Sequence, residues 1–220
     1  MSRHRALLLD AFGTLITVDR PAERLQASLA ARLGTEIAPE QAEAAMRAEM
    51  RHYREHCQQA CDAESLAELH RECAAIVMDR CGVDAPEEPA LAVLSDAVVI
   101  RAYDDAPPAL EMARRRGLAT AVVSNGDCSM PSQLEQAGLH VDVVVDSATA
   151  GAAKPDPAIF RRALHLLGVA AAEALHVGDH EELDGDGARA AGIDVVIIDR
   201  SGSGGPGRIA SLAELDSVIS

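Results

Sequence analysis

Residues 6–15 read Ala-Leu-Leu-Leu-Asp-Ala-Phe-Gly-Thr-Leu, a short apolar run that ends at Asp10 and continues into Gly13-Thr14. Such a run is typical of a buried strand in a parallel sheet. A carboxylate directly after the strand could act as a nucleophile, and the backbone amides that follow could hold an anion. A turn capped by Asp10 explains these residues equally well. The stretch therefore indicates the fold, and other parts of the chain must decide the chemistry.

Similar runs recur along the chain and alternate with amphipathic segments. Glycine follows several of these segments, as expected at the ends of helices. The alternation predicts an α/β fold: a Rossmann-like, three-layer core in which helices cover both faces of a parallel sheet. We expect strands at 6–10, 119–124, 141–146, 174–178 and 194–199, and helices at 107–116, 129–137, 157–167 and 184–191.

The segment after the first expected strand has a different pattern. From about residue 17 to residue 97 it is helical throughout, with charged residues between Leu, Ala and Met. We therefore predict a core formed by residues 1–16 and 98–220, and an all-helical cap domain at 17–97. Insertions at this position commonly cover the site that an open α/β sheet forms at the carboxyl ends of its strands.

The composition excludes several classes of partner. The 220 residues contain 35 acidic and 20 basic side chains, a net charge of −15, which repels nucleic acid. No apolar run is long enough for a signal peptide or a membrane span, so we expect a cytoplasmic protein without a membrane partner. Five cysteines, an odd number, indicate reduced thiols.

Polar side chains also lie at the ends of two more of the expected strands and before one of the expected helices. Ser124-Asn125 ends one strand, Lys154 is the single lysine of the chain, and Asp179 and Asp184 lie five residues apart after another strand. A lysine can neutralise a carboxylate and a bound anion, and clustered carboxylates suit a hard cation such as Mg²⁺. Ordinary turns and a solvated acidic loop remain alternatives for each piece taken alone.

Taken in order, the motifs Asp-x-x-Gly-Thr, Ser-Asn, Lys-Pro-Asp-Pro and Gly-Asp-x-x-x-x-Asp resemble the haloacid dehalogenase-like hydrolase superfamily. The resemblance spans the whole chain and includes a helical cap inserted after the first motif. It implies a Mg²⁺-dependent enzyme, and we expect a phosphatase acting on a small phosphorylated metabolite through an aspartyl phosphate.

The resemblance also implies a role for each matching residue. Asp10 would be the nucleophile, Ser124 would bind the transferred group, and Lys154 would hold Asp10 and the phosphoryl oxygens. We assign substrate binding to Thr14 and Asn125. The metal ligands would be Asp10, the backbone carbonyl of Phe12, Asp179 and Asp184.

Phe12 departs from the pattern of the family's phosphatases. They usually carry a second Asp there as general acid and base, whose loss typically lowers the rate ~10²–10⁴-fold. The first motif is similar to that of the 2-haloacid dehalogenases, which need neither this acid nor magnesium. A dehalogenase-type hydrolase and a weakly active or non-catalytic binding protein therefore remain alternatives.

The expected cap contains four residues of metal-binding type within ten positions: His52, His56, Cys57 and Cys61. Spacings of four place pairs of them on one helix face, so a zinc site is conceivable. No repeated Cys-x-x-Cys motif supports it, and ordinary helix residues are the alternative we favour.

Overall fold

The computed structural model describes residues 3–202, 205 and 207–219, and the chain divides into two compact units. The larger unit consists of Met1–Thr17 and Ala102–Ser220, and the smaller unit of Val18–Arg101. The smaller unit thus begins one residue after the expected boundary at 17 and ends four residues after the one at 97.

The larger unit is built on a six-stranded sheet, with the order β5-β4-β1-β6-β7-β8 and parallel pairing throughout. Parallel neighbours bring the carboxyl ends of their strands to one edge, and the nearly continuous Leu, Val and Ile runs fit a sheet buried on both faces. The strands are β1 (Ala6–Leu9), β4 (Ala119–Ser124), β5 (Val143–Asp146), β6 (Ala174–Gly178), β7 (Asp194–Ile198) and β8 (Arg208–Ile209).

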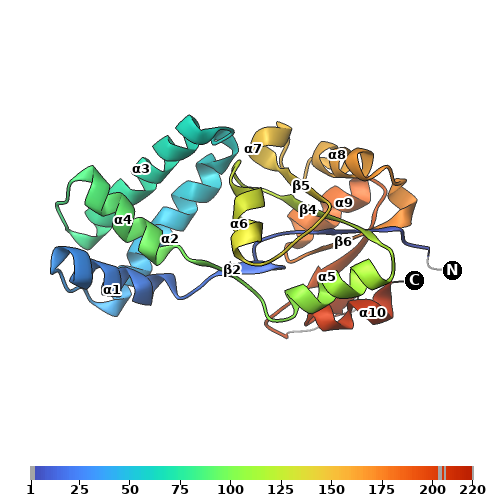
Figure 1. Cartoon of the computed structure of the whole chain (residues 1–220), viewed down its shortest axis with the longest axis horizontal. Helices are drawn as coiled ribbons and strands as arrows, with labels where there is room; N and C mark the ends of the chain where they lie inside the picture. The colour runs from blue at the N-terminus through green and yellow to red at the C-terminus, as the bar shows by residue number, and fades with distance from the viewer. Residues whose placement is uncertain (1–2, 203–204, 206, 220) are drawn as a thin grey trace. The chain divides into compact units, whose positions relative to one another are not determined.

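Helices cover both faces of this sheet. In Figure 1, α8 and α9 lie on one face, and α5 and α10 lie on the other. Phe160 and Ile159 of α8 pack against Leu8 and Val123 of the sheet, all four fully buried. The helices are α5 (Ala106–Arg115), α6 (Met130–Gln136), α7 (Ser147–Ala150), α8 (Pro157–Leu167), α9 (Gly187–Ala190) and α10 (Leu215–Val218).

The expected helix at 184–191 is only partly correct. Residues Glu181–Asp186 form a π-helical segment, η3, and α9 follows it. The imidazole of His180 accepts a hydrogen bond from the backbone amide of Leu183 (3.3 Å) and so caps this segment. π-Helical turns are rare and frequently occur at functional sites. Here the turn contains Asp184.

Two short strands join the units and were not expected from the sequence. They are β2 (Ile16–Val18) and β3 (Ile100–Ala102), which pair in a separate two-stranded sheet. The Tyr103 amide donates to the Leu15 carbonyl (2.9 Å), and the Asp19 amide donates to the Val99 carbonyl (2.8 Å). The chain therefore leaves and re-enters the core through adjacent segments that run in opposite directions.

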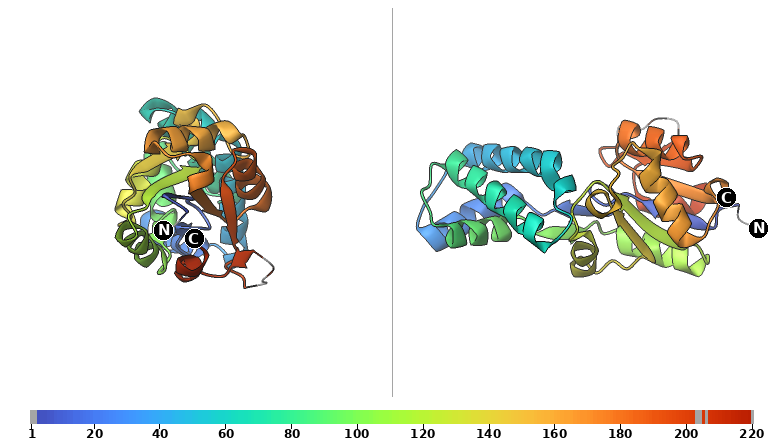
Figure 2. Two further views of the ribbon diagram at one scale, coloured as in Figure 1. Left: turned by 90° about the vertical axis from the view of Figure 1, so that its right-hand side faces the viewer. Right: turned by 90° about the horizontal axis from the view of Figure 1, so that it is seen from above.

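The smaller unit is a bundle of four helices, seen side by side in the right-hand view of Figure 2. Apolar side chains from all four helices form its core, among them Leu29, Met46, Val77 and Val93. Asp62 caps the third helix by accepting a hydrogen bond from the Ser65 amide (2.9 Å). The helices are α1 (Pro21–Leu33), α2 (Pro39–His56), α3 (Ala63–Cys81) and α4 (Glu87–Ala97).

None of the helices within the described residues has both the length and the apolar character that crossing a bilayer requires.

Candidate active site

The candidate site lies where three neighbouring strands of the sheet end. Asp10 directly follows β1, Ser124 is the last residue of β4, and Asp179 directly follows β6. Because β1 lies between β4 and β6 in the sheet, Asp10 lies between the ends of the two other strands. The crevice at the carboxyl ends of such strands is the usual site for ligands in this architecture.

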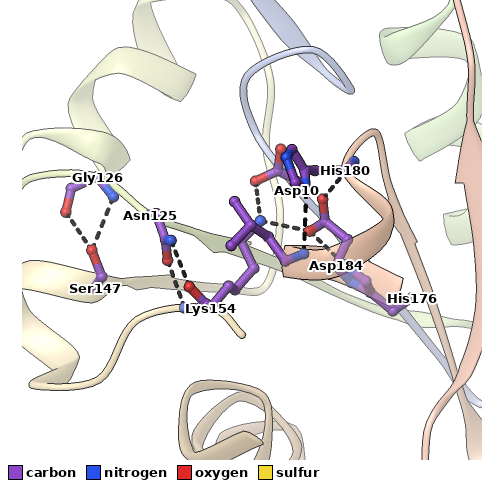
Figure 3. A network of polar contacts seen from close by, with 9 residues as sticks. Asp10, Asn125, Gly126, Ser147, Lys154, His176, His180 and Asp184 are labelled. Atoms are coloured by element: carbon purple, nitrogen blue, oxygen red, sulfur yellow. Dashed lines mark hydrogen bonds and ion pairs between the residues drawn. The ribbon is translucent and has the colours of Figure 1, made fainter. Parts of the chain in front are cut away.

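A buried lysine joins two of the acids (Figure 3). The Lys154 ammonium lies 2.6 Å from Asp10 Oδ1 and 2.6 Å from Asp184 Oδ1. All three side chains are almost fully buried, so their charges interact with little screening by water. The single lysine of the chain is thus bound to both carboxylates at once.

Asp184 is the most heavily hydrogen-bonded acid of the site. Besides Lys154, its Oδ1 binds His176 Nε2 (3.0 Å), and its Oδ2 accepts from the His180 amide (3.1 Å). A carboxylate has about four lone-pair sites. Three are occupied here, which leaves room for one more ligand.

The charges around this cluster shift the pKa values of its members. Burial raises the pKa of Asp10, and the Asp184 charge adds to this effect, whereas Lys154 opposes it. Burial also opposes ionisation of Asp184, but hydrogen bonds from His176 and Lys154 hold the pKa of Asp184 well below its usual range. Despite burial, the two bound carboxylates raise the pKa of Lys154, so the ammonium stays charged. Desolvation and the charges of Asp10 and Asp184 raise the pKa of Asp179.

Two glycines allow the acids to lie close to the backbone. A Cβ on Gly13 would lie 2.2 Å from Asp179 Oδ2, and Gly13 has a φ of +82°, which other residues rarely adopt. A Cβ on Gly178 would lie 2.1 Å from Asp184 Cγ. The positions of both aspartates therefore require glycine at these two places.

Asn125 binds the lysine-bearing segment. Its Nδ2 donates to the Lys154 carbonyl (3.0 Å), and its Oδ1 accepts from the Lys154 amide (2.7 Å). The neighbouring Gly126 is held in the same way, because Ser147 Oγ accepts from its amide (3.1 Å) and donates to its carbonyl (3.2 Å). Both pairs are visible in Figure 3. Asn125 thus positions the backbone of Lys154.

The remaining candidates are Ser124, which ends β4, and Phe12 and Thr14, which lie in the turn after β1. Ser124 is buried. Phe12 is half-buried, and its backbone forms an isolated β-bridge with Ile16. Thr14 is fully buried, and its hydroxyl has no hydrogen-bond partner among the described residues. His176 was not singled out from its sequence position, although a polar ring in an otherwise apolar strand was a usable signal.

The three acids have the geometry of a metal site. Asp10, Asp179 and Asp184 each offer an oxygen, and these oxygens lie within 4.8 Å of one another. When ionised, three carboxylates and one ammonium carry a net charge of −2, which a divalent cation would balance. Oxygen-only ligands fit Mg²⁺. Within residues 3–202, 205 and 207–219, no other group of His, Cys, Asp and Glu has this geometry, so the histidines and cysteines considered for zinc do not form such a group.

Comparisons with known proteins find relatives that are named as phosphatases. "Phosphatase MT3486" from Mycobacterium tuberculosis is 41% identical over 121 residues, which are 53% of this chain and 55% of that protein. The chain therefore spans about half the length of this curated relative. The crystal structure of a HAD phosphatase from Thermococcus onnurineus is 26% identical and has a TM-score of 0.64, with 98% of this chain and 97% of that chain covered.

A dehalogenase shares the fold. The L-2-haloacid dehalogenase from Xanthobacter autotrophicus has a TM-score of 0.67 at 20% identity, with 98% of both chains covered. The family model described as "haloacid dehalogenase-like hydrolase" matches residues 4–192. This match covers most of the chain, and the four motifs lie together at one edge of the parallel sheet. The chain therefore belongs to the haloacid dehalogenase-like family of hydrolases.

Proposed function

We propose that this chain is a Mg²⁺-dependent phosphatase that hydrolyses a small phosphomonoester through a phosphorylated Asp10. The observation that carries the proposal is the Lys154 ammonium, bound to both Asp10 and Asp184 beside Asp179. A carboxylate that attacks a phosphate dianion needs nearby positive charge, and this cluster combines one fixed cation with a site for a second. The 41% identical relative named as a phosphatase supports the same chemistry.

In the first step, Asp10 Oδ2 forms a bond to phosphorus while the bond from phosphorus to the leaving oxygen breaks. Lys154 holds Asp10 Oδ1, which orients the carboxylate and offsets its charge. The leaving oxygen takes a proton from water. Mg²⁺, held by Asp10, Asp179, the Phe12 carbonyl and the remaining lone pair of Asp184, would supply further charge neutralisation.

In the second step, water attacks phosphorus and the bond to Asp10 breaks, which releases phosphate and a proton and restores the carboxylate. We place the Ser124 hydroxyl and the unpartnered Thr14 hydroxyl near the phosphoryl oxygens. Asn125 acts on the reaction through the Lys154 backbone that it binds. We assign substrate selection to the helical unit as a cap.

Phe12 determines which substrates react well. Its ring cannot protonate the leaving oxygen, so we expect fast turnover only with good leaving groups such as p-nitrophenolate. Replacing Phe12 with Asp would restore an acid at this position. Alkyl phosphates should gain more from Phe12→Asp than p-nitrophenyl phosphate does.

The test is hydrolysis of p-nitrophenyl phosphate over a range of Mg²⁺ concentrations. We expect turnover that requires Mg²⁺, is lost in Asp10→Asn, and needs at least about ten times more Mg²⁺ in Asp179→Asn. Asp186→Asn is the matched control, because Asp186 is an exposed acid at the end of η3 that pairs with Arg189. Metal-independent turnover, or activity retained in Asp10→Asn, would contradict the proposal.

The second candidate is a 2-haloacid dehalogenase, favoured by the apolar Phe12 beside Asp10. Asp10 would then displace halide from carbon, and water would hydrolyse the resulting ester. Chloride release from 2-chloropropionate without Mg²⁺, in a protein that leaves p-nitrophenyl phosphate intact, would favour this activity.

A further inference from the structure

Arg200, which follows β7, binds the turn that comes after Asp10. Its Nε donates to the Gly13 carbonyl (3.1 Å), and its Nη2 donates to the Thr14 carbonyl. The same guanidinium forms two hydrogen bonds to the Asp105 carboxylate, at 3.1 Å and 2.9 Å. One side chain therefore joins the end of β7 to the Asp10 turn and to the segment before α5.

The guanidinium is held on several sides. Its carbon lies 3.7 Å from the centre of the Tyr103 ring, a cation–π contact. Asp105 also accepts from Ser211 Oγ (2.6 Å) and from the Leu212 amide (2.9 Å). Although burial opposes ionisation, these donors and Arg200 lower the pKa of Asp105, so the ion pair persists at neutral pH.

The turn that Arg200 binds is also one wall of the acidic cluster. The Cα of Gly13 packs against the Asp179 carboxyl so closely that a Cβ would lie 2.2 Å from its Oδ2. A shift of the Gly13 peptide therefore changes the space available to Asp179 and the path of the backbone after Asp10. Arg200 holds that peptide in place through its hydrogen bond to the Gly13 carbonyl.

We propose that Arg200 is a positioning residue for the metal site, because it holds the Gly13–Thr14 turn and thereby sets the spacing of Asp10 and Asp179. The inference rests on the proposed function and extends it to a residue outside the four motifs. Arginine suits the task because its planar fork donates several hydrogen bonds in fixed directions, whereas lysine is a flexible point charge.

Arg208 provides a matched comparison. It lines the same pocket of about 340 Å³ as Arg200, Gly13 and Asp179, but its guanidinium binds Glu181 (3.0 Å) on the surface. Loss of Arg208 removes one positive charge from the pocket and leaves the contacts of Arg200 with the Gly13–Thr14 turn in place. The effect of geometry can thus be separated from the effect of charge.

The experiment is calorimetric titration of the metal-free full chain with Mg²⁺, for the wild type, Arg200→Gln and Arg208→Gln, with p-nitrophenyl phosphate kinetics in parallel. We expect Arg200→Gln to raise the Kd for Mg²⁺ about 10-fold and to lower kcat more than it changes KM. Arg208→Gln should keep both values within about twofold of the wild type. Arg200→Lys keeps the charge but replaces four hydrogen bonds in fixed directions with at most three from a single nitrogen, so it should also weaken Mg²⁺ binding.

The outcomes separate the two proposals. If the wild type binds Mg²⁺ and Arg200→Gln or a folded Arg200→Lys binds it equally well, the role of Arg200 is refuted while the proposed function stands. An equal loss of affinity in Arg208→Gln would refute the specific role of Arg200, because removal of a nearby positive charge by itself strengthens the binding of a cation. A wild-type protein that binds no Mg²⁺ would overturn the proposed function together with this inference.

Discussion

Replacement of Asn125 with Ala tests whether the backbone of Lys154 must be held for the site to work. The change removes two hydrogen bonds to the Lys154 main chain, at 3.0 Å and 2.7 Å. At about 1 kcal/mol each, with about 1 kcal/mol more for a stranded backbone group, the free energy of unfolding should fall by about 2–3 kcal/mol. For a chain of this length the Tm should fall by about 5–10 °C.

The effect on catalysis should be larger than the effect on stability alone suggests. A displacement of Lys154 moves the ammonium away from both Asp10 and Asp184, and misplacement by about 1 Å can lower a rate about 100-fold. We expect kcat for p-nitrophenyl phosphate to fall about 10- to 100-fold at a temperature where the variant is fully folded. Thermal unfolding followed by circular dichroism gives the stability of the same sample.

Ser147→Ala is the control for this prediction. It also removes two hydrogen bonds from a backbone, those to Gly126, but it leaves Lys154 bound to Asn125. The control should lose a similar amount of stability, because the hydrogen bonds that it loses are of the same kind. Its kcat should stay within about twofold of the wild type, because Lys154 keeps its bonds to Asn125. The reasoning is refuted if Asn125→Ala keeps the wild-type kcat, or if both variants lose activity equally.

Two further changes test other features. Gly178→Ala places a Cβ 2.1 Å from Asp184 Cγ, so we expect the free energy of unfolding by urea to fall by about 1–3 kcal/mol. The activity of this variant should also respond more weakly to Mg²⁺. Unchanged stability would show that Asp184 can move freely. Burial raises the pKa of Glu49, although a hydrogen bond donated by the Cys73 thiol opposes this, so the ionised form is unfavourable in the folded state. Glu49→Gln should therefore stabilise the helical unit by about 1 kcal/mol at pH 7. The wild type should therefore lose stability as pH rises from about 4.5 through the raised pKa of Glu49. The stability gained by Glu49→Gln should shrink toward acidic pH. Glu55→Gln, at an exposed position, is the control and should change neither the stability nor its dependence on pH.

The sequence was sufficient where a segment has a clear period or a clear boundary. The strands 119–124 and 174–178 and the helix 157–167 have the bounds expected from their apolar patterns. Proline at the start of that helix and glycine after it explain why its ends were predictable. The strands β2 and β3 were missed because three residues are too few to show an alternation.

The site shows a similar division. The motifs indicated that Asp10, Lys154, Asp179 and Asp184 belong together, and the structure places them in one cluster. The contacts that hold the cluster were not predictable, because they depend on packing between distant segments. His176 is an example: its ring contacts Asp184, which lies in the π-helical segment η3, and spacing along a regular helix does not predict that contact.

The paired strands β2 and β3 have a consequence for the history of the chain. Because the two ends of the helical unit are already hydrogen-bonded neighbours, the sheet needs only a short turn between them to stay continuous. Segments that leave and return at one point can be exchanged without changing the order of the core strands. A different insertion between β2 and β3 is therefore compatible with the same core sheet, and we expect such an exchange to leave the residues at the carboxyl ends of β1, β4 and β6 in place.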